Sequence, residues 1–188
     1  MALTPPRLLD SVPYDNYSGL WDDLPGPVGS LAAGAATPDP IAFGPSGNIR
    51  VFGMDGGATS EMFDGVGQVL HVWEEGTELR PHIHYCSSTT GTGSVKFYLD
   101  YYALSFGQIA TGAPTTTTAT GTADGTPWKH QIASFPPIPM TGKTVSSLII
   151  YRLYRDPGTD TYGSDICPLS FDFHFLKDSD GSGEEYVK

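Results

Sequence analysis

Apolar and polar side chains alternate residue by residue over most of the chain, and this period of two constrains the fold more than any other feature. In the run 93–103, Val95 and Phe97 fall on one face while Lys96 and Asp100 fall on the other. A strand places successive side chains on opposite faces of a sheet, whereas a helix needs apolar residues every three to four positions. No such helical spacing recurs, so the sequence predicts an all-β domain.

Clusters of Gly, Pro, Asp and Thr interrupt the alternation and favour turns. The expected strands are 49–54, 68–73, 79–86, 93–103, 145–154 and 166–177, with 115–122 as an edge strand or a loop. Roughly seven or eight antiparallel strands in about 140 residues is the size of a jelly-roll-like β-sandwich, which we place at residues 46–188. Its expected core comprises Val51, Leu70, Val72, Ile83, Phe97, Leu99, Ile149, Phe171 and Phe173.

The first 45 residues lack this alternation and hold eight of the sixteen prolines together with a single cation, Arg7. A segment of this composition rarely forms a core by itself, so residues 1–45 are either disordered or an extended Pro-rich arm. The large side chains in the segment favour an arm that docks on a neighbouring subunit. Its expected anchors are Tyr14, Tyr17, Leu20 and Trp21.

The charge balance narrows the classes of partner. Lys and Arg number 10 against 21 Asp and Glu, which gives a formal net charge of −11. Nucleic acids and anionic membranes attract clustered cations, so we expect neither as a direct partner. The apolar runs are too short to cross a bilayer and no signal peptide is evident, which predicts a soluble protein made in the cytoplasm. Two cysteines form no disulfide framework, and we expect both to be buried free thiols.

Two of the predicted strands carry a polar face that bears imidazoles. Alternation along 166–177 sends the phenylalanines to one face and a carboxylate and an imidazole to the other. Along 79–86 it separates apolar side chains from an arginine and two histidines. The His-x-His spacing places both rings on one side of a sheet, as in metal sites and cupin enzymes. The two polar faces consist of Arg80, His82, His84, Asp172 and His174.

The cupin motifs are incomplete. Gly76 lies six residues before His82, as the first motif requires, but the glutamate expected shortly after the second histidine is absent. The second motif has no match around residues 136–142. The sequence therefore predicts no metal, no cofactor and no catalytic residues, and we expect the histidines to form a hydrogen-bonded polar layer or a subunit contact. If that is wrong, the metal ligands are His82, His84 and His174.

Other motifs with a chemical role are missing from the sequence. It contains no Gly-x-Ser-x-Gly elbow, no phosphate-binding loop and no Cys-x-x-Cys pair. Residues 159–165 space several oxygen ligands but lack the terminal glutamate of a calcium loop, so a polar turn between two long strands is expected there.

Several segments resemble a group of tailed-bacteriophage and prophage virion proteins. They are GTELRPHIHY at 76–85, YRLYRD at 151–156, DTYGSD at 160–165 and the C-terminal stretch from Phe171 to Lys188. The resemblance covers about residues 48–188 and hardly touches the arm. It implies a β-sandwich component of the particle, such as a head-decoration (cement) protein or a neck or tail appendage, with no catalytic residues.

The expected function is accordingly a non-enzymatic virion protein that decorates the capsid. It would self-associate as a dimer or trimer and bind the major capsid protein or another virion protein, and its acidity suits the outside of a capsid, away from DNA. Two alternatives stay open. A tail-fibre or neck appendage that binds a receptor or carbohydrate would expose an aromatic platform, and a cupin-like metal-dependent enzyme would direct imidazoles into a ligand-sized pocket.

Overall fold

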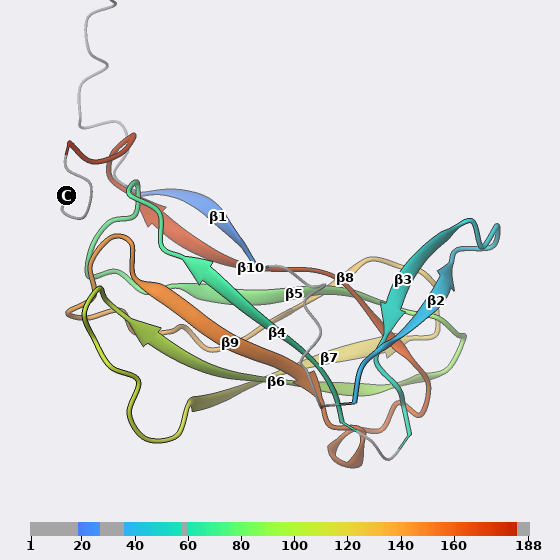
Figure 1. The fold of residues 1–188 in the computed structure, drawn as a ribbon. Coiled ribbons are helices and arrows are strands. Elements are labelled where there is room, and N and C mark those ends of the chain that lie inside the picture. The colour runs from blue at the N-terminus through green and yellow to red at the C-terminus, as the bar shows by residue number, and fades with distance from the viewer. Residues whose placement is uncertain (1–18, 27–35, 58–59, 184–188) are drawn as a thin grey trace, which may run out of the picture.

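The computed structural model describes residues 19–26, 36–57 and 60–183 (Figure 1). In this part of the chain the regular elements are strands, apart from the single 3-10 turn η2 (Pro157–Thr159), and no helix is long and apolar enough to cross a lipid bilayer. The strands are β1 (Leu20–Gly26), β2 (Asp39–Phe43), β3 (Ile49–Gly53), β4 (Glu61–Gln68), β5 (Arg80–Ser87), β6 (Thr92–Leu104), β7 (Thr115–Asp124), β8 (Gln131–Ser134), β9 (Leu148–Arg155) and β10 (Ile166–Lys177).

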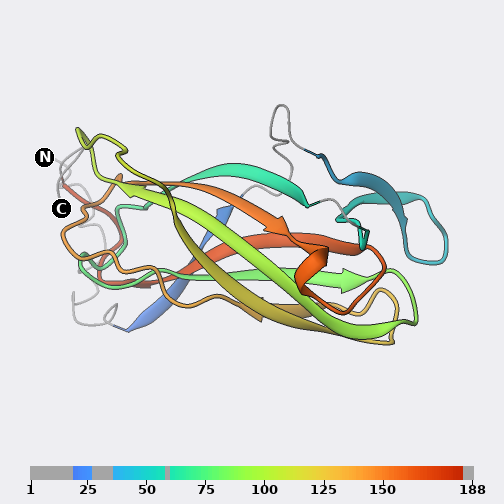
Figure 2. The same ribbon diagram turned by 90° about the horizontal axis from the view of Figure 1, so that it is seen from below.

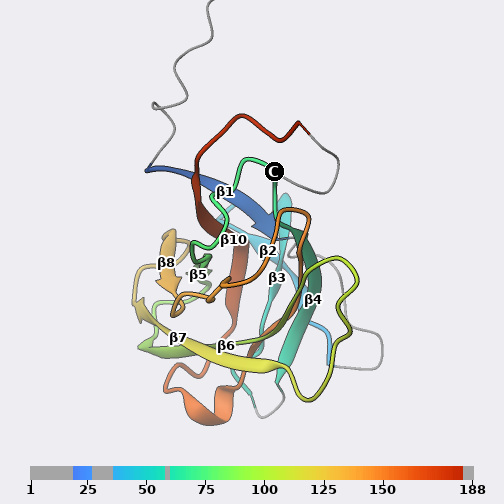
Figure 3. The same ribbon diagram turned by 90° about the vertical axis from the view of Figure 1, so that its left-hand side faces the viewer.

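The strands form two four-stranded antiparallel sheets and one hairpin. The first sheet has the order β1-β10-β5-β8, the second has the order β4-β9-β6-β7, and β2 pairs only with β3. Figure 3 shows the two sheets as separate layers, while Figure 2 shows the β2–β3 hairpin projecting beyond them. The prediction of an all-β antiparallel fold is confirmed. With β2 and β3 left out, each strand lies in the opposite sheet from the strand that precedes it in the chain, except that β6 and β7 lie in the same sheet. This order is compatible with a jelly roll.

The core lies between the two sheets and is rich in aromatic rings. Phe171 of β10 contacts Tyr151 of β9 with ring centroids 5.1 Å apart, and Tyr85 of β5 contacts Phe97 of β6 at 5.2 Å. These pairs join the layers, because each takes one ring from either sheet, and burial of such large apolar surfaces drives the folding. Six of the nine predicted core residues are fully buried there: Ile83, Phe97, Leu99, Ile149, Phe171 and Phe173.

The strand predicted at 68–73 is wrong, because the strand in this region is β4 and it ends at Gln68. Leu70 is consequently 41% exposed and Val72 is only partly buried. The pattern of alternation did not reveal β4, because this strand has a glycine at a position that faces the core. A Cβ atom at Gly65 would lie 2.4 Å from the Tyr151 hydroxyl, so the ring of the tyrosine occupies the space that an apolar side chain would fill.

Val51 is also misplaced in the predicted core. It lies in β3, which pairs with β2 in the hairpin outside the two large sheets, and its side chain is only half-buried. By contrast, the threonine-rich tract forms the edge strand β7, which is one of the two alternatives that the sequence left open. The short strand β8 was missed, because four residues with one buried side chain, Ala133, give too little alternation to recognise.

Part of the predicted arm belongs to the sandwich. Strand β1 pairs with β10 of the same chain along its whole length, and Leu24 is buried in the core. This segment therefore contributes contacts within its own subunit, whereas the sequence led us to expect an arm that docks on a neighbouring subunit. The strand contains Pro25, which is tolerated there because one side of an edge strand needs no backbone donor. Tyr14 and Tyr17 lie outside the described residues.

A buried arginine anchors the loop between β9 and β10. Arg155 Nε donates to Asp160 Oδ2 at 2.8 Å, and Nη1 donates to the backbone carbonyls of Met54 and Ser164 at 3.0 and 2.7 Å. Nη2 donates to the carbonyl of Tyr162. The expected polar turn is thus present, and a single guanidinium inside the protein fixes its shape.

Candidate functional site

The strand register brings the two predicted histidine faces together. Strands β5 and β10 are neighbours, and His82 lies directly opposite Asp172 while Arg80 lies opposite His174. The side chains between them, such as Ile83 and Phe173, point into the core. The sequence pattern predicted each polar face separately, and the pairing of β5 with β10 makes them one site on the outer surface of the first sheet.

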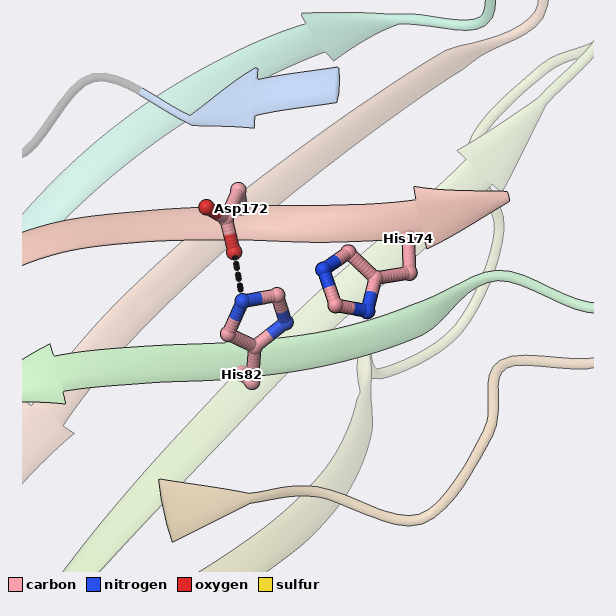
Figure 4. A group of neighbouring side chains, drawn as sticks. All are labelled: His82, Asp172 and His174. Carbon is pink, nitrogen blue, oxygen red and sulfur yellow. Dashed lines mark ion pairs between the residues drawn. The ribbon is translucent and has the colours of Figure 1, made fainter. Parts of the chain in front are cut away.

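At the centre of this site His82, Asp172 and His174 lie close together (Figure 4). His82 Nε2 is 2.5 Å from Asp172 Oδ1, and the rings of His82 and His174 have centroids 4.1 Å apart. One ligand atom from each of the three residues lies within 4.8 Å of the others. On the far side of His82, the ring of His84 follows at a centroid distance of 4.9 Å, and its Nε2 is 3.6 Å from Asp172 Oδ2.

Two further residues, which the sequence did not indicate, extend the cluster at either end. His84 Nδ1 lies 2.6 Å from His130 Nε2, and these rings stack with centroids 4.9 Å apart. At the other end His174 Nε2 lies 2.8 Å from Asp23 Oδ1, because Asp23 is the register partner of His174 on β1. We call this arrangement the histidine row; it comprises His130, His84, His82 and His174 with the carboxylates Asp172 and Asp23.

Burial and neighbouring charges act in opposite directions on the imidazoles of the row. Burial lowers the pKa of His82, but the hydrogen bond and charge of Asp172 outweigh it and hold this pKa above the ordinary value. Burial likewise lowers the pKa of His84; Asp172 opposes the shift, whereas His82 and His130 add to it, and the pKa stays below the ordinary value. Of these two imidazoles, His82 therefore holds a proton more readily than His84.

Four members of the row line a groove of about 670 Å³, namely Asp23, His82, His84 and His174. Side chains from β8 and the segment after it line the same groove, so these three imidazoles border a space that could admit a small ligand. The lining residues are Asp23, Arg80, Pro81, His82, His84, Ile132, Ser134, Phe135, Pro137 and His174.

The remaining predicted interface residues lie near one end of the row. Arg80 Nε donates to Glu78 Oε1 at 2.7 Å, and its guanidinium carbon lies 4.6 Å from the centroid of the Trp21 ring. Trp21 and Leu20 on β1 are both about half exposed. The described interface candidates thus all lie on the three consecutive strands β1, β10 and β5 of the first sheet.

The ligand set that the geometry groups differs from the alternative set predicted from the sequence. The set in the structure contains Asp172 in place of the predicted His84, and the Nδ1 atom of His84 is directed at His130 instead. The imidazoles also lie on the outer face of a sheet, because the phenylalanines of β10 fill the space between the layers. Two imidazoles and one carboxylate at this spacing have the donor set of a transition-metal site.

Comparison with known proteins identifies no family for this chain. A scan against protein-family models found no match, and a search of the curated proteins found none either.

Proposed function

We propose that this chain is a non-enzymatic structural protein of a tailed-phage particle, and specifically a capsid decoration protein. In this role it self-associates and binds the major capsid protein, and it resides in the virion. The observation that carries the proposal is an apolar patch on the outer face of the second sheet.

This apolar patch forms where three strands bring aliphatic and aromatic side chains into register. Val66 of β4, Ile150 of β9 and Tyr102 of β6 are consecutive partners across the sheet, and Leu148 follows on β9. Val66 is 52% exposed and Ile150 is 38% exposed. With Pro114, three of these side chains line a shallow groove of about 640 Å³.

Contiguous apolar side chains on an outer face are typical of surfaces that bind another protein. The patch has a polar rim, because Asp64, Arg152 and Asp100 form the next row across the same three strands. An apolar centre with charged groups at its border is the usual anatomy of a protein interface. The opposite sheet carries the histidine row, so the molecule offers two chemically distinct faces to its neighbours, as a component of a shell requires.

The segments that resemble phage virion proteins support the same proposal. They fall on β5, on β9, on the loop anchored by Arg155 and on β10, which together form much of the sandwich. The resemblance therefore concerns the framework of the domain. The net charge of −11 agrees with a position on the outer capsid surface, where packaged DNA does not repel the protein.

The oligomeric state of the protein, and the change in that state when residues of the apolar patch are substituted, test this proposal. By light scattering coupled to size-exclusion chromatography, the full chain should be a dimer or trimer, and Ile150→Lys and Val66→Lys should shift it to monomer. Thr120→Lys is the matched control, because Thr120 is exposed on edge strand β7 of the same sheet, outside the patch. Antibodies against the chain should also label particles from the strain that carries its gene. A monomeric protein that is absent from particles would refute the proposal.

One observation favours the appendage alternative. Tyr98 of β6 and Tyr154 of β9 stack on the outer face of the second sheet, with ring centroids 5.0 Å apart and planes 15° apart. Stacked tyrosines can serve as a platform for sugar rings. Retention of the chain by a glycan, lost in Tyr98→Ala and Tyr154→Ala but kept in Ile150→Lys, would favour this function over decoration.

A further inference from the structure

We infer that His82, Asp172 and His174 bind one divalent transition-metal ion, such as Zn²⁺, on the outer face of the first sheet. This site goes beyond a structural role in the particle and reverses the sequence-based expectation of a metal-free polar layer.

The backbone places the three ligand groups on one face without any loop. His82 and Asp172 are register partners on adjacent strands, and His174 follows Asp172 by two residues, so alternation directs it to the same side. Sites built on paired strands are held more precisely than sites built on loops. Figure 4 shows the two imidazoles and the carboxylate converging between β5 and β10.

The spacing of the ligand atoms is close to what a tetrahedral ion needs. Bonds of about 2.0–2.1 Å at tetrahedral angles separate the ligand atoms by roughly 3.3 Å. His82 Nε2 and Asp172 Oδ1 are already closer than this, and all three ligand atoms lie within 4.8 Å of one another. The side chain of His174 is 45% exposed, so its ring can rotate by the remaining distance without disturbing the core.

The carboxylate at the centre of the cluster is buried and faces an imidazole nitrogen. Asp172 Oδ1 pairs with His82 Nε2 at 2.5 Å. A buried carboxylate oxygen is costly unless a cation or a hydrogen-bond donor faces it. His82 meets that need only through a proton on Nε2, and a metal ion bound between Asp172 and the two imidazoles would take the place of that proton.

The donor set selects the class of ion. Imidazole nitrogens suit Zn²⁺, Co²⁺ and Ni²⁺, whereas Ca²⁺ and Mg²⁺ require oxygen ligands. Three protein ligands leave a fourth position. Asp23 is a candidate for it, because its Oδ1 lies 2.8 Å from His174 Nε2 and its side chain is half exposed. With Asp23 included, the ion would join strands β1, β10 and β5.

Metal binding by tag-free protein, stripped with a chelator and dialysed, tests the inference. Titration with Zn²⁺ against a chromophoric competitor should give one equivalent bound, and Co²⁺ should give the visible absorption of a four-coordinate site. His174→Gln and Asp172→Asn should each weaken Zn²⁺ binding by at least about tenfold. His71→Gln is the matched control and should bind as the wild type does, because His71 lies outside the row and bonds to Ser146 and Ser182.

His174 is the most informative position because its exposed side chain can be replaced without loss of the fold, which circular dichroism would verify. Failure of the wild type to bind Zn²⁺ at about 100 µM, some hundredfold above a micromolar Kd, would overturn the inference. So would unchanged affinity in both His174→Gln and Asp172→Asn. Binding that is lost in His130→Gln but kept in His174→Gln would place the ion at the other end of the row and would overturn it equally.

Discussion

Replacing Asp160 with asparagine should destabilise the protein strongly, because it leaves the buried guanidinium of Arg155 without its counterion. The side chains of Arg155 and Asp160 are 0% and 1% exposed, and they are joined by hydrogen bonds of 2.8 and 3.3 Å. Removing one member of a buried pair leaves the other charge uncompensated, which costs about 3–5 kcal/mol. Asparagine keeps the shape of the side chain, and three backbone carbonyls still accept from the guanidinium, so we expect about 3 kcal/mol.

The chain contains a natural control for this substitution. Arg152, on the same strand, makes the same two-bonded contact with Asp64, at 2.7 and 3.0 Å, but these side chains are 44% and 40% exposed. Water screens an exposed pair, so Asp64→Asn should cost only about 0–1 kcal/mol. The two substitutions share their chemistry and differ in burial, which isolates the contribution of the protein interior.

Urea unfolding followed by tryptophan fluorescence at pH 7 measures both free energies. Thermal unfolding should report the same order, with the midpoint of Asp160→Asn lower by about 6–12 °C, given 2–4 °C per kcal/mol for a domain of this size. Added salt should leave the Asp160 effect in place and diminish the Asp64 effect. If Asp160→Asn costs no more than Asp64→Asn, the carbonyls alone stabilise the guanidinium, and the reasoning from burial is wrong.

Three further predictions follow from buried groups. Phe173→Ala should cost about 3–5 kcal/mol in urea unfolding, because its ring is 0% exposed between the sheets; a cost below 1 kcal/mol would contradict this packing. Burial raises the pKa of Glu61, and the hydrogen bond that its carboxylate accepts from the Asp55 backbone offsets this shift only in part. The free energy that this carboxyl contributes to folding is therefore complete below its pKa in the unfolded chain. It is lost as the pH rises through the higher pKa of the folded protein. Glu61→Gln should therefore unfold at higher urea than the wild type at pH 7, and a difference that persists unchanged at pH 4 would refute the assignment. Cys86 and Cys167 are free and buried, as the sequence predicted, and the structure makes them register partners on β5 and β10. A thiol reagent should therefore label them only in denaturant, and rapid labelling of the native protein would show that β5 and β10 open.

Local alternation was a reliable guide for β5, β6 and β10, where large apolar side chains occupy the core-facing positions. It located β5, β6 and β10 and assigned the correct face to Phe173 and to His174, since both properties depend only on position along a strand. It failed at β4, where Gly65 makes room for a tyrosine from another strand, and at β1, where Pro25 is tolerated at a sheet edge. Those two strands depend on packing between segments that are distant in the sequence.

The composition of the histidine row depended on the same long-range information. Asp172 lies beside His82 because β10 pairs with β5, and Asp23 lies beside His174 because β1 pairs with β10. His130 precedes a strand too short to be recognised, yet it reaches His84 because β8 borders β5. A sequence pattern can identify which side chains share a strand face, but the register between strands decides which of those faces meet.

The β2–β3 hairpin offers a place to attach a reporter. Its strands pair with each other, and its tip turns through Gly44 and Gly47, which adopt φ values of 71° and 63°. An added Cβ atom at Gly44 would meet no other atom within 4 Å. Figure 1 shows the tip extending beyond the end of the sandwich. A short epitope or fluorophore inserted at this tip would leave both outer faces uncovered, so assembly and metal uptake could be followed on one labelled molecule.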